Sequence, residues 1–119
     1  MVRRDAIVTD QAPAAIGPYS QGVKAGGMLF VSGQIPLDPA TGQMVGSDIA
    51  TQTCQVMRNL EAVLAAAGCT FDHVVRSTIY LVDLADFGVV NDIYGEVFAA
   101  PAPARATVQV ARLPRDARV

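Results

Sequence analysis

One arginine has the sequence surroundings of an anion-binding residue. Arg105 lies between a proline-rich segment and an apolar one, in the run Pro103-Ala104-Arg105-Ala106-Thr107-Val108. Its planar guanidinium matches a carboxylate through two parallel hydrogen bonds. The same side chain also forms structural ion pairs with aspartate. The sequence therefore predicts either a site for a small carboxylate or an ion pair, and both interpretations stay open.

Three further polar side chains occur in bent or apolar segments. Tyr19 follows the Gly17-Pro18 bend, Ser32 lies in an apolar strand pattern, and Asn91 precedes Tyr94 by three residues in a helical pattern. A buried hydroxyl needs a hydrogen-bond partner, and a tyrosine after a bend is directed at a ligand or packed into the core. Taken singly, these residues favour local structural roles.

The composition argues against several other chemistries. Nine Lys and Arg residues against eleven Asp and Glu give a net charge of -2, unlike a nucleic-acid-binding protein. The one histidine, His73, has no neighbouring ligands for zinc. Cys54 and Cys69 are too few for a disulfide framework and predict free thiols, as in a cytoplasmic protein. No secretory signal or membrane span of ~20 apolar residues is recognisable. We expect no metal, cofactor, nucleic acid or membrane partner.

The elements that must position these residues follow the order β-β-α-β-α-β. Adjacent glycines in Ala25-Gly26-Gly27 suit a hairpin turn between two strands. The apolar periodicity then predicts two helices and two more strands. The predicted strands are Tyr19–Lys24, Met28–Ile35, His73–Asp83 and Ala106–Ala111, and the predicted helices run from Asp48 to Ala67 and from Asp83 or Asp86 to Phe98.

Together these elements predict one α+β domain over residues 1–119, with two helices on one face of a mixed sheet. The chain is 51% apolar and only 17% charged. A sheet face without helices would then leave apolar surface in water. We therefore expect a homo-oligomer that covers this face.

Four segments, taken together with Leu113-Pro114, resemble one known family. They are Ile16-Gly17-Pro18-Tyr19-Ser20-Gln21, Phe30-Val31-Ser32-Gly33-Gln34-Ile35-Pro36, Val90-Asn91-Asp92-Ile93-Tyr94 and Pro103-Ala104-Arg105-Ala106-Thr107-Val108. In order and spacing they are similar to the RidA/YjgF family, the reactive intermediate (enamine/imine) deaminases. The resemblance extends from about residue 8 to the last residue.

The resemblance implies a chorismate-mutase-like fold assembled as a homotrimer, with sites in the clefts between subunits. It implies hydrolysis of 2-imino or 2-enamino acids, such as 2-iminobutanoate and 2-iminopropanoate, to 2-keto acids and ammonia. These reactive intermediates are released by pyridoxal-phosphate enzymes. The hydrolysis itself needs no cofactor.

The resemblance also assigns roles to residues. Arg105 would clamp the substrate carboxylate, and Tyr19 would line the catalytic pocket beside it. Thr107 stands where many members have cysteine, and its backbone groups would face the reacting carbon or nitrogen. The remaining substrate contacts would come from Ser32, Gly33 and Asn91.

One part of the family pattern is not matched. After Leu113-Pro114 the pattern continues into a last strand beginning Val-Glu-Ile-Glu, and a glutamate there is thought to activate the water. This sequence ends at Val119, so we expect a truncated chain or a short native end with impaired hydrolysis. A non-catalytic carboxylate-binding or chaperone-like trimer is therefore an alternative. RNA cleavage, described for some relatives, is disfavoured by the net charge and the single histidine.

Overall fold

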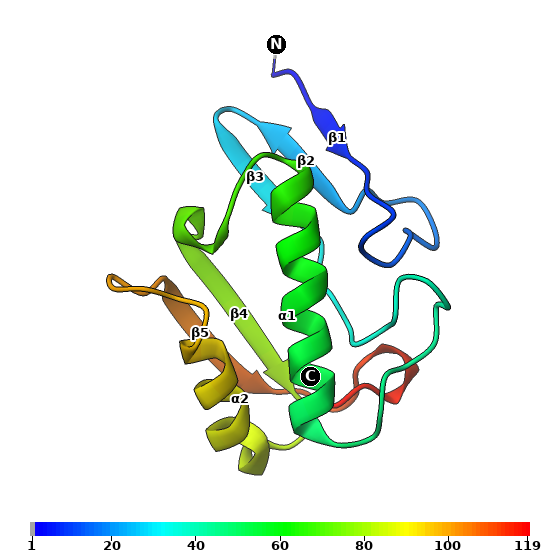
Figure 1. The fold of residues 1–119 in the computed structure, drawn as a ribbon, viewed down its shortest axis with the longest axis vertical. Coiled ribbons are helices and arrows are strands. Elements are labelled where there is room, and N and C mark those ends of the chain that lie inside the picture. The colour runs from blue at the N-terminus through cyan, green and yellow to red at the C-terminus, as the bar shows by residue number, and fades with distance from the viewer. Residues whose placement is uncertain (1) are drawn as a thin grey trace.

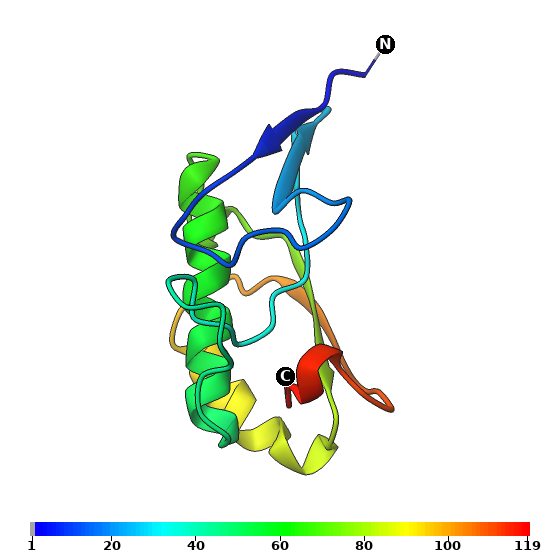
Figure 2. The same ribbon diagram turned by 90° about the vertical axis from the view of Figure 1, so that its right-hand side faces the viewer.

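Two helices lie on one side of the strands in the computed structural model, which describes residues 2–119. Figure 2 shows α1 (Ile49–Ala66) and α2 (Phe87–Gly95) on one side and the strands on the other. α1 is the longer helix and lies in front of the strands in Figure 1, whereas α2 packs beside β4 and β5. This arrangement confirms the predicted α+β class with two helices on one face.

The strands include both antiparallel and parallel pairs. β1 (Asp5–Ile7), β2 (Gly22–Ala25) and β3 (Met28–Val31) form an antiparallel sheet in the order β1-β2-β3. β4 (Arg76–Leu81) and β5 (Ala104–Gln109) form a separate parallel pair, with α2 as the crossover between them. In this pair Ser77 lies opposite Arg105 and Ile79 opposite Thr107.

Several predicted boundaries were wrong by a few residues. The short strand β1 was not predicted, because three mostly exposed residues become a strand only by pairing with the distant β2. Strand β5 begins at Ala104, two residues before the predicted start, because its pairing with β4 begins there. The other corrections are as follows: β2 begins at Gly22 and not Tyr19, β3 ends at Val31 and not Ile35, β4 spans Arg76–Leu81 and not His73–Asp83, β5 ends at Gln109 and not Ala111, and α2 ends at Gly95 and not Phe98.

Helix α1 begins and ends where the sequence indicated. The Asp48 side chain accepts a hydrogen bond from the Thr51 backbone N–H (2.9 Å), which caps the helix. Gly68 follows the helix with φ of 77°, a left-handed conformation that favours glycine. Residues that recur at helical spacing along this segment are buried, namely Ile49, Thr53, Val56, Val63, Leu64 and Ala67.

The last residues of the chain pack between α1 and β4. A core cluster of Ile49, Leu81 and Val90 also contacts Val119. The Val82 N–H donates to the Arg118 carbonyl (3.3 Å). One guanidinium nitrogen of Arg118, Nη2, donates to both carboxylate oxygens of Asp86, at 3.0 and 2.9 Å. This ion pair joins the C-terminal residues to the residue that precedes α2.

The strand face opposite the helices carries large apolar side chains in solvent. Because side chains alternate along a strand, Met28 and Phe30 share one side of β3, and Tyr80 lies on the outer side of β4. Met28 is 49% exposed, Phe30 60% and Tyr80 49%. Val108 of β5 is 40% exposed and also points away from the helices. The single chain therefore leaves an apolar sheet face uncovered.

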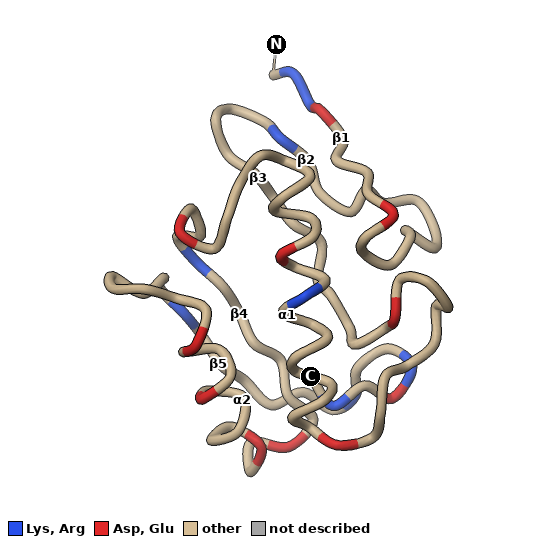
Figure 3. The backbone as a smooth tube through the Cα atoms, viewed as in Figure 1, with Lys and Arg blue, Asp and Glu red and all other residues tan. Residues whose placement is uncertain are grey.

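Charge is distributed over the whole molecule. Figure 3 shows Lys and Arg interspersed with Asp and Glu along the chain, and the basic residues do not cluster on one side of this view. Within residues 2–119, neither helix has the length and apolar character needed to span a membrane.

Candidate anion-binding site on β5

The guanidinium of Arg105 lies against two aromatic rings of α2. Its Cζ is 5.0 Å from the centre of the Tyr94 ring and 5.5 Å from that of Phe87. Both distances are within the range of a cation–π interaction. Among the described residues Arg105 has no acidic partner within ion-pair distance. Of the two interpretations left open by the sequence, the structure therefore disfavours a structural ion pair within the chain.

Tyr94 is itself fixed in position by two neighbours. Its hydroxyl hydrogen-bonds to the Ser77 hydroxyl of β4, and its ring packs on Phe98 with ring centres 4.4 Å apart. Phe98 in turn meets Phe71 edge to face at 5.3 Å. Tyr94 is buried, so its conformation is restricted on several sides. Tyr94, one of the two aromatic contacts of Arg105, is thus part of the packed interior between α2 and β4.

An open pocket of about 390 Å³ lies beside Arg105. Its walls are Leu84 and Phe87, which lie before and at the start of α2, and Arg105 and Thr107 of β5. Arg105 and Thr107 are two residues apart on a strand and so face the same side. The Thr107 Oγ1 atom is buried and has no hydrogen-bond partner within residues 2–119. The pocket therefore combines a free positive charge, an unpaired hydroxyl and an apolar wall.

Tyr19, Ser32 and Gly33 do not line this pocket. Tyr19 lies in the segment between β1 and β2, on the opposite side of the molecule from β5 (Figure 1). Its hydroxyl accepts a hydrogen bond from the Ile16 N–H (3.2 Å). The Ser32 hydroxyl donates to the Ser20 carbonyl (2.5 Å). Within one chain, the structure does not bring these three residues to Arg105.

Gly33 is exposed, and a Cβ atom at this position would meet nothing within 4 Å. The fold of the chain itself therefore gives no steric reason for glycine here.

Asn91 lies on the site-facing side of α2. It is four residues after Phe87 and three before Tyr94, so the three share one helical face. Asn91 is half-buried and does not line the pocket. Its predicted position at the border of a cleft stays a prediction.

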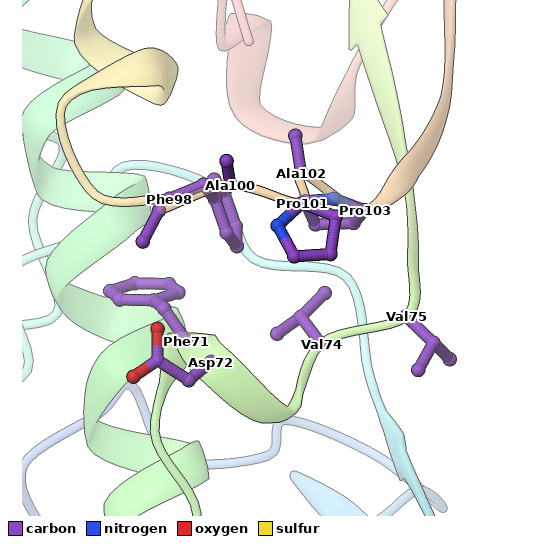
Figure 4. Close-up of a pocket in the computed structure, with 10 residues that line it drawn as sticks. Phe71, Asp72, Val74, Val75, Phe98, Ala100, Pro101, Ala102 and Pro103 are labelled. Carbon is purple, nitrogen blue, oxygen red and sulfur yellow. The ribbon is translucent and has the colours of Figure 1, made fainter.

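A second depression, of about 550 Å³, lies between the turn before β4 and the loop before β5 (Figure 4). Figure 4 shows Phe71 and Val74 on one side and Phe98, Pro101 and Pro103 on the other. None of the residues singled out from the sequence as site residues lines it. Apart from the exposed carboxylate of Asp72, its lining offers no charged group.

The sequence reasoning missed Leu84, Phe87, Tyr94 and Ser77 as parts of the site. Phe87 and Tyr94 recur at helical spacing in the sequence, and such a pattern is usually explained by burial. Ser77 gave no signal, because its proximity to Tyr94 depends on how β4 packs against α2. The contact of Tyr94 with Arg105 gave no local signal either, because it depends on how α2 packs against β5.

The fold and site define an α+β protein with an arginine-based pocket suited to a small anion. The model of the family described as endoribonuclease L-PSP matches residues 9–119. The chain belongs to this family, which is the RidA/YjgF family that its sequence motifs resemble.

Proteins of several kingdoms are similar to this chain. "Protein DfrA" of Myxococcus xanthus is 61% identical over 98% of this chain and 90% of its own length. The 2-iminobutanoate/2-iminopropanoate deaminase of Mus musculus is 49% identical over 98% of this chain and 86% of its own. The structure of E. coli TdcF with bound serine superposes with a TM-score of 0.91 at 42% identity, covering 96% of this chain and 91% of that one. Relatives that carry deaminase names support a deaminase-like role within the family.

Proposed function

We propose that this chain hydrolyses 2-imino or 2-enamino acids to 2-keto acids and ammonia. The observation that carries the proposal is the guanidinium of Arg105, which is held by two aromatic rings and lacks an acidic partner among residues 2–119. A carboxylate matches this planar donor through two parallel hydrogen bonds. Two similar proteins support the same chemistry: one is named as an imine deaminase, and the other is described with bound serine, which carries a carboxylate.

The proposed hydrolysis requires the protein mainly to position a substrate that is already reactive. An imine carbon is already electrophilic, and more so when its nitrogen is protonated. Arg105 would fix the carboxylate, the apolar wall of Leu84 and Phe87 would contact the substrate side chain, and Thr107 would face the reacting atoms. Water then adds to the carbon, and ammonia leaves as the carbonyl forms. Positioning of this kind lowers the barrier without a cofactor.

The site would be completed by a second copy of the chain in a homotrimer. The uncovered apolar face of β3, β4 and β5 is the surface available for association. In such an assembly Tyr19, Ser32 and Gly33 of one copy would approach Arg105 of its neighbour. The open space beside Gly33 supports this arrangement, because it allows close approach of a second backbone or a ligand.

The test uses an imine produced in situ by an amino-acid oxidase or a threonine dehydratase. We expect the chain to accelerate keto-acid release above the spontaneous rate, and Arg105→Ala to abolish the acceleration while remaining folded. An oligomeric mass of three chains is expected by light scattering. Keto-acid release at the spontaneous rate with the wild-type chain would refute the proposed activity.

A second candidate is a trimer that binds small carboxylates without turnover. Within residues 2–119, no carboxylate lines the pocket beside Arg105, and this observation favours the second candidate. The lining residues therefore include no carboxylate base that could activate water. This candidate predicts binding of 2-ketobutyrate that depends on Arg105, with no acceleration of imine hydrolysis.

A further inference from the structure

The turn that begins the apolar wall of the pocket is hydrogen-bonded to β5 through the side chain of Gln109, which does not itself line the pocket. The short 3-10 turn η2 (Leu84–Asp86) leads directly into α2 and carries Leu84. The backbone N–H groups at a helix start lack partners within the helix and need others. Asp83 satisfies two of them: its side chain accepts from the Ala85 N–H (2.8 Å), and its carbonyl accepts from the Asp86 N–H (3.1 Å).

The remaining N–H, that of Leu84, donates to the side-chain oxygen of Gln109 at 2.9 Å. Gln109 is the last residue of β5, and the pair is separated by 25 residues. Gln109 is two residues after Thr107 and four after Arg105, so all three side chains leave the same side of the strand. Strand β5 therefore carries the guanidinium of Arg105 and, through Gln109, also holds the turn that carries Leu84 of the apolar wall.

We infer that Gln109 is a positioning residue that holds Leu84 and Phe87 against Arg105 and thereby sets affinity for the substrate carboxylate. This inference rests on the proposed function for its kinetic consequence. Without the hydrogen bond, the η2 turn keeps its contacts to Asp83 but loses its tie to β5. The wall then moves independently of the guanidinium, and a smaller fraction of molecules has the binding-competent pocket.

The substitution Gln109→Leu removes the acceptor at similar size, whereas Gln109→Glu retains an oxygen that accepts from the Leu84 N–H. The net contribution of one intramolecular hydrogen bond changes a local equilibrium constant by roughly two- to tenfold. For Gln109→Leu we expect the KM for the imino acid to rise by up to that factor, with kcat within about twofold of wild type. Gln109→Glu should restore KM, because a charge roughly 13 Å along the strand from Arg105 is largely screened at physiological salt. Gln43→Leu, at another exposed glutamine, is the matched control.

Two readouts test the inference without turnover. Amide hydrogen exchange at Leu84 should accelerate in Gln109→Leu and stay slow in Gln109→Glu, and the Kd for 2-ketobutyrate should change in parallel with KM. Unchanged Leu84 exchange, or a fall in kcat at constant KM, would overturn the inference. If the wild-type chain binds 2-ketobutyrate but does not turn over imine, the proposed hydrolysis fails, and exchange and Kd still decide the role of Gln109. If it neither binds nor turns over, both proposals for the pocket fail.

Discussion

A buried amide in α1 provides a quantitative test of how the fold is held together. Asn59 is fully buried, and both the nitrogen and the oxygen of its side-chain amide form hydrogen bonds. Its Nδ2 donates to the carbonyls of Ile35 (3.2 Å) and Leu37 (3.0 Å), and its Oδ1 accepts from Gln55 Nε2 (2.8 Å). These contacts attach the segment after β3 to the helix. Asn59→Leu keeps the branched shape of the side chain at a larger volume, and it removes the partner of the Leu37 carbonyl and of the Gln55 amide N–H. The Ile35 carbonyl still accepts from the Leu37 N–H (2.7 Å).

Leaving a buried polar group unpaired costs about 1–3 kcal/mol. For these two groups, together with the cost of fitting a larger side chain into a filled site, we expect Asn59→Leu to lower the free energy of unfolding by about 3–5 kcal/mol. This is a large part of the ~5–15 kcal/mol of a typical domain. The assay is urea unfolding followed by circular dichroism at fixed protein concentration, because association shifts apparent stability.

Gln55→Leu is the graded control, because it removes only the donor to Asn59 Oδ1. We expect it to cost about 1–2 kcal/mol. A loss below about 1 kcal/mol for Asn59→Leu, or a larger loss for Gln55→Leu than for Asn59→Leu, would refute the view that this amide fixes the segment after β3.

Two further predictions concern helix starts. Arg118→Met should lower the free energy of unfolding by about 1–2 kcal/mol, because the mostly buried Asp86 loses its charged partner. This value lies between those for exposed and buried ion pairs. Adding Asp86→Asn to this variant should recover part of the loss in the same urea assay, and strict additivity would contradict a direct interaction. At the start of α1, the hydrogen bond from the Thr51 backbone holds the pKa of Asp48 below its usual 3.8. The stability from this ionised cap is present above pH 3.8 and is lost as pH falls through the lower folded pKa, so the melting temperatures of wild type and Asp48→Ala should converge only in strong acid.

Local signals were sufficient for the helices and the hairpin. The Asp48 cap, the Gly68 terminus and the spacing from Ile49 to Ala67 all depend on neighbours in sequence, and they located α1 to within a residue at each end. The paired glycines Gly26 and Gly27 adopt the positive φ of a tight turn. Such features are decided within one or two turns of chain, so the sequence alone predicts them.

Features that depend on distant pairing could not be located in this way. Strand β1 exists because Ala6 pairs with Val23, and the start of β5 is set by Arg76 opposite Ala104. The site residues divide in the same way, into those with a local sequence signal and those placed by distant packing. Arg105 was recognisable from its local sequence, whereas Tyr94 and Gln109 entered the site through packing between α2 and β5, which no local pattern records.

The aromatic setting of Arg105 has a consequence for the regulation of turnover. Rings of Phe87 and Tyr94 orient the guanidinium but do not neutralise it, so its charge stays available to any small anion. The 2-keto acid formed by the proposed reaction keeps the carboxylate by which its precursor was held. Product and substrate therefore compete for the same donor, and the reaction slows as its own keto acid accumulates.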